Sequence, residues 1–284
     1  MHPYFCDGRR CFAGDAAQVD RQVMHGRSGA LMAMVTGLVL AAGSAWAQWV
    51  PGPREPFDMQ LTAPFQLERE VGALALGVFE TSPSRLQGLK VRGARTVCVV
   101  NAGAWENWRP DSGAFDQRLV GANLAGWPGE RWLDIRAQDQ LRPLMAKRLD
   151  LCRSKGFDGV LFRNLDGYAH RTGFPLTAKD QLAYVRWLAA EARTRGLASG
   201  LMNTLELVPE LVGEFDFELA EGCFDAERCA ALTAFRKRDK PAIVIEYTNV
   251  RRKMDADCAA AQELDLQVVF KTKSLNGKIH RRCP

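Results

Sequence analysis

The chain has 284 residues, 47% of them apolar, which is enough for one large domain with a sizeable core or for two small domains. Its 38 basic and 33 acidic residues give a formal charge of +5, and no run of Lys and Arg with interleaved aromatic residues occurs. This modest, dispersed charge argues against nucleic acid as a partner.

The N-terminal 47 residues have the pattern of an export signal. Arg27 precedes an apolar run over 30–42, and the segment 43–47 (GSAWA) then supplies an A-x-A cleavage pattern. The run is shorter than the roughly 20 residues that cross a bilayer, so we expect no stable membrane span after signal removal. Met24 stands where a signal peptide should begin. We interpret 1–47 as a spurious extension plus signal peptide, with a buried apolar helix as the alternative, and predict an exported protein, periplasmic or extracellular.

The cysteine pattern agrees with export, because an even number remains after residue 47: Cys98, Cys152, Cys223, Cys229, Cys258 and Cys283. Cys223 and Cys229 flank a short loop and are the first expected disulfide, and Cys258 with Cys283 would link the C-terminal tail. Cys98 lies in an apolar strand and is interpreted as a small buried hydrophobic residue. No CxxC or HExxH motif occurs, so we predict no metal site, and no cofactor is predicted either.

The first half of the chain begins with a Pro-rich segment, 48–70, that we expect to be an irregular arm. The nearly unbroken apolar run over 71–79 is typical of a strand that is buried on both faces. A helix then begins at Ser82 or Pro83. The elements expected next are a strand over 96–101, a long loop over 102–129, a short strand over 131–135, a helix over 138–155 that ends at Gly156, and a strand over 158–162.

The second half continues the alternation, starting with a helix that Thr177 caps and Gly196 ends. The remaining expected strands cover 197–203, 215–220, 242–246 and 267–271, and helices at 205–212, 227–238 and 255–264 separate them. Eight strands alternating with helices predict parallel pairing and right-handed crossovers. Because no G-x-G-x-x-G follows the first strand, we predict a single (β/α)8 TIM barrel over 71–284 rather than a dinucleotide-binding fold.

Polar residues end several of these strands, where a barrel of this kind has its active site. They are Glu80, Asn101, Asp134, Arg163, Asn164, Asp166, Asn203, Glu221 and Glu246, with Trp105, Trp108, Trp127, Tyr168 and Tyr247 in or beside the same loops. Aromatic rings stack on the C–H faces of sugars, and amides and carboxylates bond their hydroxyls, so the set favours a glycan site.

Structural alternatives exist for several of these residues. Asp134 is as well explained by an ion pair with Arg136, Asp166 by a turn before Gly167, and the tryptophans by core packing. Glu221 and Glu246 each close an apolar run, where a carboxylate is harder to explain as structure.

Several blocks in one order resemble glycoside hydrolase family 114, whose named activity is endo-α-1,4-polygalactosaminidase. The blocks are CVVNAGAWENWRPD (98–111), GWPGERWLDIR (126–136), KGFDGVLFRNLDGY (155–168), RTGFPLTAKDQLAYVRWLAAEARTRGLASGLMN (171–203), LAEGCF (219–224) with Cys229, and KPAIVIEY (240–247). The resemblance covers about 71–273. It implies a TIM barrel and an exported hydrolase of galactosamine-rich polysaccharide, with catalytic carboxylates at the strand ends.

The chain departs from the family pattern at three places. Where the family has E-P-D-N-x-D-G-Y, residues 161–168 read LFRNLDGY, so that Arg163 stands in place of an acid expected to be catalytic. The family's G-L-K-N-D is GLMNT at 200–204, and an acid expected on the first strand aligns with Gly77. The residues that keep the pattern are Asn164, Asp166, Tyr168, Asn203, Glu221, Glu246 and Tyr247.

Two interpretations follow, because glycoside hydrolysis ordinarily requires two carboxyl groups. The first is a hydrolase in which Glu221 and Glu246 act with help from Asp166, and substrate is bound by Arg163, Asn164, Tyr168, Asn203, Trp105 and Tyr247. The alternative is a pseudoenzyme, a barrel that binds glycan or serves as an envelope scaffold, with Arg163 ion-paired to a remaining Glu. Arg163 would keep a neighbouring carboxyl ionised, and would favour a neutral or acidic glycan over a cationic galactosamine chain.

Overall fold

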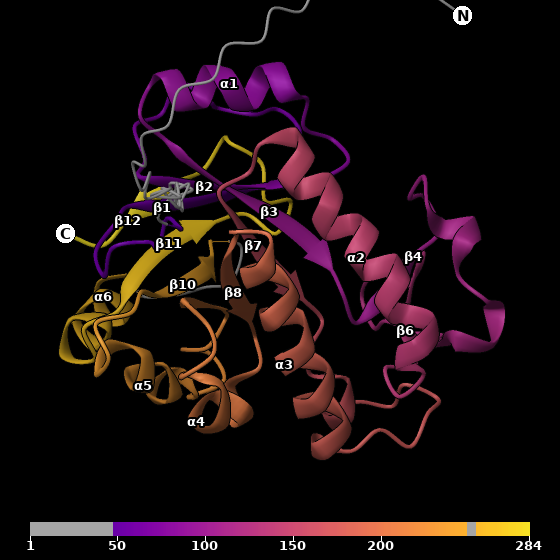
Figure 1. The fold of residues 1–284 in the computed structure, drawn as a ribbon. Coiled ribbons are helices and arrows are strands. Elements are labelled where there is room, and N and C mark those ends of the chain that lie inside the picture. Colours follow the sequence, from indigo (N-terminus) through magenta and orange to yellow (C-terminus); the bar gives the residue numbers. More distant parts are fainter. Residues whose placement is uncertain (1–47, 249–253) are drawn as a thin grey trace, which may run out of the picture. The chain divides into compact units, whose positions relative to one another are not determined.

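The computed structural model describes residues 48–248 and 254–284 (Figure 1). The expected signal peptide and alternative start codon fall in 1–47, outside the described residues. In the part that is described, no helix combines the length and the apolar character needed to cross a bilayer.

The main sheet is curled and almost entirely parallel (Figure 1). In the described residues it has nine strands, in the order β1 (Phe57–Gln60), β2 (Ala73–Gly77), β3 (Arg95–Asn101), β7 (Gly159–Arg163), β8 (Ala198–Met202), β9 (Phe217–Glu221), β10 (Ala242–Tyr247), β11 (Gln267–Lys271) and β12 (Arg281–Arg282). Every neighbouring pair from β1 to β11 is parallel, and β12 pairs antiparallel with β11. The carboxyl ends of the parallel strands therefore share one edge.

Helices follow most of these strands. They are α1 (Pro83–Val91), α2 (Gln138–Lys155), α3 (Ala178–Thr194), α4 (Val208–Leu211), α5 (Thr233–Arg236) and α6 (Met254–Glu263), with 3-10 turns η1 (Ser112–Ala114), η2 (Gln117–Leu119), η3 (Gly167–Ala169), η4 (Leu205–Leu207) and η5 (Cys229–Leu232). Figure 1 shows α1, α2 and α3 on the outside of the curled sheet. This is the alternating α/β architecture that the sequence predicts.

The ends of the long helices are set by the residues that the sequence indicates. The Ser82 side chain accepts from the Arg85 amide at the start of α1, and Thr177 forms a capping box with Asp180 at the start of α3. Gly156 ends α2 in the left-handed conformation, with φ of 96°, which glycine adopts at little cost.

Several strands differ from the sequence prediction, because β1, β4 (Ala104–Glu106), β5 (Val120–Asn123) and β12 (Arg281–Arg282) were not predicted and one predicted strand lies in another sheet. The segment predicted as a barrel strand over 131–135 instead gives β6 (Glu130–Leu133), which pairs antiparallel with β4 and β5 in a separate three-stranded sheet. The barrel-type sheet gains β1 from the segment expected to be an irregular arm. The polar residues Asp58 and Gln60 make the segment resemble a loop in sequence, although both side chains are buried in the structure.

The seam between β1 and β11 is bridged mainly by side chains. Asp58 pairs with Lys271, both side chains being fully buried, and also lies 2.9 Å from Arg69 and 3.1 Å from His280. Beyond β1, the Leu61 amide donates to the Leu275 carbonyl at 2.8 Å. No ladder joins β1 to β11 in the described residues, so the sheet is a parallel-rich half-barrel rather than a demonstrated closed (β/α)8 barrel.

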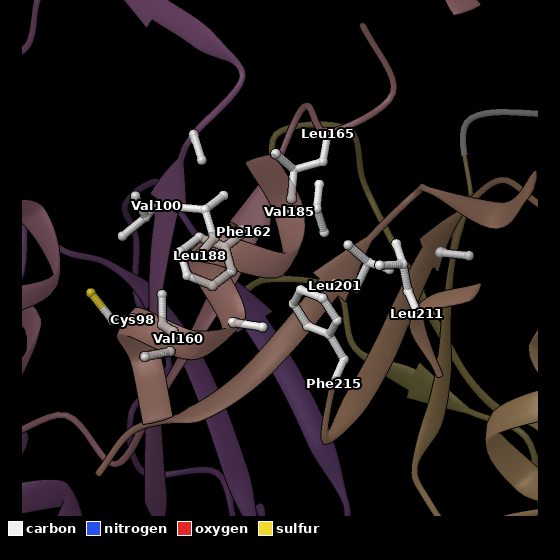
Figure 2. Close-up of a cluster of buried hydrophobic side chains, with 14 of the residues drawn as sticks. Cys98, Val100, Val160, Phe162, Leu165, Val185, Leu188, Leu201, Leu211 and Phe215 are labelled. Carbon is white, nitrogen blue, oxygen red and sulfur yellow. The ribbon is translucent and has the colours of Figure 1, made fainter. Parts of the chain in front are cut away.

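Side-chain alternation divides the core into two layers, because successive residues of a strand face opposite sides. The concave face of the sheet packs a small apolar cluster that includes Phe57, Met59, Val97, Val99, Leu161, Phe217, Leu219, Ile243 and Ile245. The larger cluster lies between the sheet and the helices (Figure 2), and includes Cys98, Val100, Val160, Phe162, Val185, Leu188 and Leu201.

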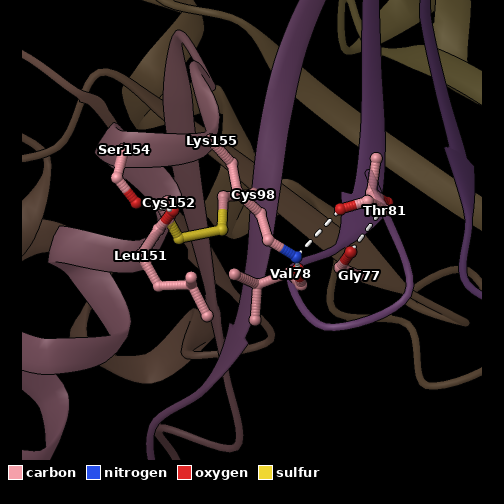
Figure 3. The surroundings of a disulfide bond; sticks show 8 residues. All are labelled: Gly77, Val78, Thr81, Cys98, Leu151, Cys152, Ser154 and Lys155. Atoms are coloured by element: carbon pink, nitrogen blue, oxygen red, sulfur yellow. Dashed lines mark hydrogen bonds between the residues drawn. A yellow bond between two sulfur atoms is a disulfide. The ribbon is translucent and has the colours of Figure 1, made fainter. Parts of the chain in front are cut away.

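The described chain contains the disulfides Cys98–Cys152, Cys223–Cys229 and Cys258–Cys283. The last two confirm the predicted pairs. The interpretation of Cys98 as an unpaired hydrophobic residue is wrong, although its complete burial was expected. Cys98 faces α2 and Cys152 belongs to the apolar stripe of that helix, so their Cα atoms lie 5.9 Å apart (Figure 3).

Candidate functional site

A cleft of about 380 Å³ opens at the carboxyl ends of β2, β3 and β7. The segments after β1 and β11 and the three-stranded sheet complete its walls. It is lined by Leu61, Thr62, Gly77, Glu80, Val99, Asn101, Glu106, Trp108, Arg109, Trp127, Glu130, Arg163, Lys273, Ser274 and Leu275. The cleft thus lies at the edge of the sheet where the sequence predicts the site.

The turn after β2 is held by Lys155, the last residue of α2 (Figure 3). Lys155 Nζ donates to the carbonyl oxygens of Val78 and Thr81, at 2.6 and 2.9 Å, and Thr81 Oγ1 donates to the Gly77 carbonyl at 2.8 Å. These bonds fix the turn after β2. A Cβ atom at Gly77 would overlap Glu80 Oε2, so the absence of a side chain at position 77 gives the Glu80 carboxylate its place in the cleft.

Arg109 links two of the lining carboxylates. Its Nε and Nη2 donate to Glu106 at 2.8 and 2.9 Å, and its Nη1 donates to Glu80. The Arg109 guanidinium also lies 5.2 Å from the centre of the Phe79 ring and 5.9 Å from that of Trp108. Because Glu106 is only 2% exposed, it anchors Arg109, and Arg109 in turn holds Glu80 at the opening.

The end of β3 is fixed by a buried arginine of α2. Arg148 donates from Nη1 to the Asn101 carbonyl at 2.7 Å and grips Asp111 with Nε and Nη2, at 2.7 and 2.9 Å. The side chain of Asn101 then donates to Glu130 Oε2 at 2.9 Å and accepts from Asn164 at 3.0 Å. The arrangement places an amide pair against a carboxyl group at the base of the cleft.

Glu130 is the lining carboxyl group most affected by burial. Burial raises its pKa above the ordinary value, and the positive charge of Arg163 opposes that shift. Asn164, at φ of 60°, reaches Glu130 Oε2 at 3.3 Å. Glu130 can therefore hold a proton at a higher pH than an exposed glutamate can.

Arg163 ends β7 on the concave face, two residues after Leu161 of the concave core. Its guanidinium lies over the Trp127 ring at 5.6 Å from the centre. The guanidinium of Arg163 forms no hydrogen bond or ion pair with any described residue. The prediction that Arg163 is ion-paired to Glu221 or Glu246 is therefore wrong.

Glu221, Asn203 and Tyr247 form a second group at the ends of β8, β9 and β10. Asn203 Nδ2 donates to Glu221 Oε2 at 3.1 Å, Asn203 Oδ1 accepts from the Glu221 amide at 2.7 Å, and the Tyr247 hydroxyl donates to Glu221 Oε1. Burial, reinforced by the charge of Glu221, raises the pKa of Tyr247 and keeps its hydroxyl a donor. The charge of Arg163 acts on both Tyr247 and Glu130, so Arg163 lies near both residues.

Glu246 is not brought to the cleft. It lies between Ile245 and Tyr247 on β10, on the opposite face from these residues, and it is 0% exposed. Its Oε1 accepts from the Phe224 amide at 3.0 Å, which fixes the loop of the Cys223–Cys229 disulfide. In this conformation its carboxylate cannot touch a substrate, contrary to the role predicted for it.

Asp166 and Tyr168 lie in a third group, beside the loop after β7. Asp166 Oδ2 is 3.0 Å from His170 Nε2, and this hydrogen bond raises the pKa of His170. The Tyr168 hydroxyl is 3.5 Å from Glu206 Oε2, and burial followed by the charge of Glu206 raises the pKa of Tyr168 to about 12. Neither residue lines the cleft.

The tryptophans divide into two kinds. Trp108 and Trp127, which are 51% and 42% exposed, stand at the cleft. Trp105 is half-buried against the core and donates from Nε1 to the Ser112 carbonyl at 3.0 Å, so it does not line the cleft. Outside the cleft, Asp134 pairs with Arg136 at 2.7 Å, in agreement with the ion-pair alternative.

One group of described residues has ligand atoms close enough for a metal ion, namely Cys223, Cys229 and Glu246. The two sulfur atoms are already joined in a disulfide. They do not offer the thiolates that a soft metal ion requires.

Sequence reasoning missed Glu106, Arg109 and Glu130 as site residues. They lie in the three-stranded sheet or beside it, and not at the ends of barrel strands. All three fall within the blocks 98–111 and 126–136 that carry the family resemblance. The i, i+3 spacing of Glu106 and Arg109 is a further signal of an ion pair.

Comparison with known proteins identifies the family. A model described as glycoside-hydrolase family GH114 matches residues 40–283. This chain belongs to family GH114. Among solved structures, Ega3 from Aspergillus fumigatus, in complex with galactosamine, is 30% identical with a TM-score of 0.78, and the match covers 84% of this chain and 98% of that one.

A second solved structure is more distant in sequence. The glycoside hydrolase domain of PelA from Pseudomonas aeruginosa has a TM-score of 0.63 at 17% identity, over 80% of this chain and 97% of that one. This likeness extends to the fold alone. No curated protein sequence matches this chain.

Proposed function

We propose that this GH114 protein is exported and binds a polysaccharide of the galactosamine type in the cleft between β2, β3 and β7. The observation that carries the proposal is the pair of exposed tryptophans at an opening whose other lining residues include carboxylates, an amide and cations. Indole faces stack on sugar rings, and the polar groups bond the hydroxyls. The galactosamine bound to the relative Ega3 and the disulfides of this chain support the sugar and the export.

We further propose that the sheet closes into a (β/α)8 barrel across the β1–β11 seam. The Asp58–Lys271 ion pair and the Leu61–Leu275 hydrogen bond support closure. Closure would hold Lys273 and Leu275 opposite β2 and β3, as the walls of the cleft require.

Binding without efficient hydrolysis is the function that the arrangement favours. Of the predicted catalytic carboxylates, Glu246 is buried on the other face and Asp166 pairs with His170 outside the cleft. Of the predicted set, Glu221 alone remains, and by itself it does not complete the pair of carboxyl groups that glycoside hydrolysis ordinarily requires.

Hydrolysis is the second candidate, and Glu130 is the observation in its favour. The raised pKa of Glu130 suits a general acid, and Glu221, which is hydrogen-bonded to Tyr247, would be the base or nucleophile. This pair differs from the one predicted from sequence.

Titration calorimetry and a reducing-end assay on galactosamine oligomers and their N-acetylated forms test both candidates. For binding alone, Trp108→Ala weakens affinity about tenfold, consistent with the loss of one aromatic contact, and no reducing ends appear. Release of reducing ends that both Glu130→Gln and Glu221→Gln abolish would establish the hydrolase instead. Absence of binding to every glycan offered contradicts both.

A further inference from the structure

Two cations in the cleft, Arg163 and Lys273, have no side-chain hydrogen-bond or ion-pair partner among the described residues, 48–248 and 254–284. Both line the same opening, Arg163 from the end of β7 and Lys273 from the segment after β11. An arginine carries five N–H donors and is always charged at physiological pH, so an unpaired one facing a cleft has unused capacity for an anion.

The lining carboxylates do not use this capacity. Glu80 and Glu106 share Arg109, which balances much of their charge. Glu130 is hydrogen-bonded by two amide side chains, and burial raises its pKa. Among the lining cations, Arg163 and Lys273 are therefore the two whose N–H donors no described side chain accepts, although the charge of Arg163 also acts on Glu130.

The charged groups adjoining this side are also engaged. Glu221, which lies beyond Tyr247, accepts from both Asn203 and Tyr247. It does not line the cleft, and no ion pair joins it to Arg163 among the described residues. A bound anion would thus meet Arg163 without competition from a paired protein carboxylate.

The orientation of Arg163 suits a planar anion. Stacking on Trp127, at 5.6 Å from guanidinium to ring centre, restrains the side chain. Stacking leaves the edge of the guanidinium, where the N–H groups lie, available for two parallel hydrogen bonds. Carboxylates match that fork better than they match the point charge of a lysine.

We propose that Arg163 and Lys273 form a subsite for the carboxylate of a uronic acid unit, so that the glycan taken by this cleft is acidic. The proposal rests on the polysaccharide-binding function proposed above and specifies its ligand. A free amine of galactosamine is protonated at neutral pH and would be repelled by both cations. Hexosamine units in the ligand are accordingly N-acetylated.

The test is calorimetric titration with four tetrasaccharides of defined charge. The acidic probe alternates N-acetylgalactosamine with glucuronic acid, and its carboxyl-reduced form is the matched neutral probe. The other two are α-1,4-linked galactosamine tetramers, N-acetylated and free. We expect the acidic probe to bind at least tenfold more tightly than its reduced form, with an advantage that shrinks as salt rises.

Variants locate the effect. Arg163→Gln and Lys273→Gln should each reduce the preference for the acidic probe over its reduced form severalfold. Lys147→Gln removes the same charge from the exposed face of α2 and should leave the preference unchanged. A preference that survives the loss of both cleft cations overturns the subsite.

The outcomes separate the subsite from the function on which it rests. Equal binding of the acidic and reduced probes, with Trp108→Ala weakening both, overturns the subsite and leaves glycan binding intact. Tighter binding of the free galactosamine tetramer also overturns it. If the protein binds none of the four probes, the proposed function fails as well.

Discussion

Glu221 and Glu246 end adjacent strands, β9 and β10, yet their side chains have different surroundings. Glu221 follows Phe217 and Leu219 on the concave face, whereas Glu246 alternates with Ile245 of that face. One position of register decides whether a carboxylate can approach the cleft or supports a loop behind the sheet.

Replacing Glu246 should therefore affect stability and leave binding unchanged. Glu246→Leu removes the acceptor of the Phe224 amide, and we expect the free energy of unfolding to fall by about 1–3 kcal/mol. Glu246→Gln, which keeps an acceptor oxygen, should lose less. Urea denaturation measures both, and a change of glycan affinity in a folded Glu246→Gln variant would contradict the structural role.

Gly77 offers a test of how Glu80 is placed. In Gly77→Ala the new Cβ overlaps Glu80 Oε2, so the carboxylate has to leave its position beside Arg109. We expect glycan affinity to fall severalfold, with a change below about 1 kcal/mol in the free energy of unfolding because Glu80 is partly exposed.

The matched control is Gly88→Ala, in α1, where an added Cβ meets no atom within 4 Å. It should stabilise the protein by about 0.5–1 kcal/mol and leave binding unchanged. Equal affinities for the Gly77→Ala variant and the wild type would show that the place of Glu80 is immaterial to binding.

Much of the candidate site was predictable at the residue scale, and the limits have physical causes. Arg163, Trp108 and Trp127 were predicted near the opening, because strand ends and adjoining loops meet there. Glu106 and Glu130 were not predicted there. Their position depends on the pairing of β4 with β6, and a single sequence does not indicate which strands pair.

At the scale of elements, local signals set the ends of the long helices, whereas the helices predicted over 205–212 and 227–238 are short 3-10 and α-helical segments. The capping box of α3 joins Thr177 and Asp180 in both directions. Thr177→Ala should lower the free energy of unfolding by about 1 kcal/mol, since it leaves an amide of the first turn without its acceptor. Thr194→Ala, the same change at the other end of α3, should stay within about 0.5 kcal/mol, because its hydroxyl is exposed. Similar losses in the two variants would contradict the capping role.

Strands were harder to predict than helices. The sequence predicted eight strands but included 131–135 and omitted β1. Segment 131–135 resembles a barrel strand in its apolar content, yet it finds partners in two neighbouring segments. β1 has charged and amide residues whose partners, such as Lys271 and His280, are more than 200 residues away. Local pattern cannot reveal a partner so distant in sequence.

At the scale of the whole molecule, the seam between β1 and β11 should make stability depend on acid. Burial opposes it, but the hydrogen bond and charge of His280 and the charge of Lys271 lower the pKa of Asp58 below its usual range. The stability this gives is fully present above the unfolded pKa of about 3.9 and is lost as the pH falls from there toward the folded pKa.

Urea denaturation between pH 6 and pH 2.5 measures the effect. The wild type should lose stability steeply below about pH 4. The double variant Asp58→Asn/Lys271→Met removes both charges together and should be less stable at pH 6 with a shallower acid dependence. Identical acid slopes in the two proteins would show that Asp58 does not contribute.

The Cys98–Cys152 disulfide joins the two ends of the excursion that carries the three-stranded sheet. This excursion supplies Glu106, Trp108, Trp127 and Glu130 to the cleft. A protease that cuts its exposed turns would therefore produce two polypeptides that remain one covalent molecule until a reductant is added. In an environment rich in proteases, the segment that forms this wall of the cleft can be cleaved and still remain attached through the Cys98–Cys152 disulfide.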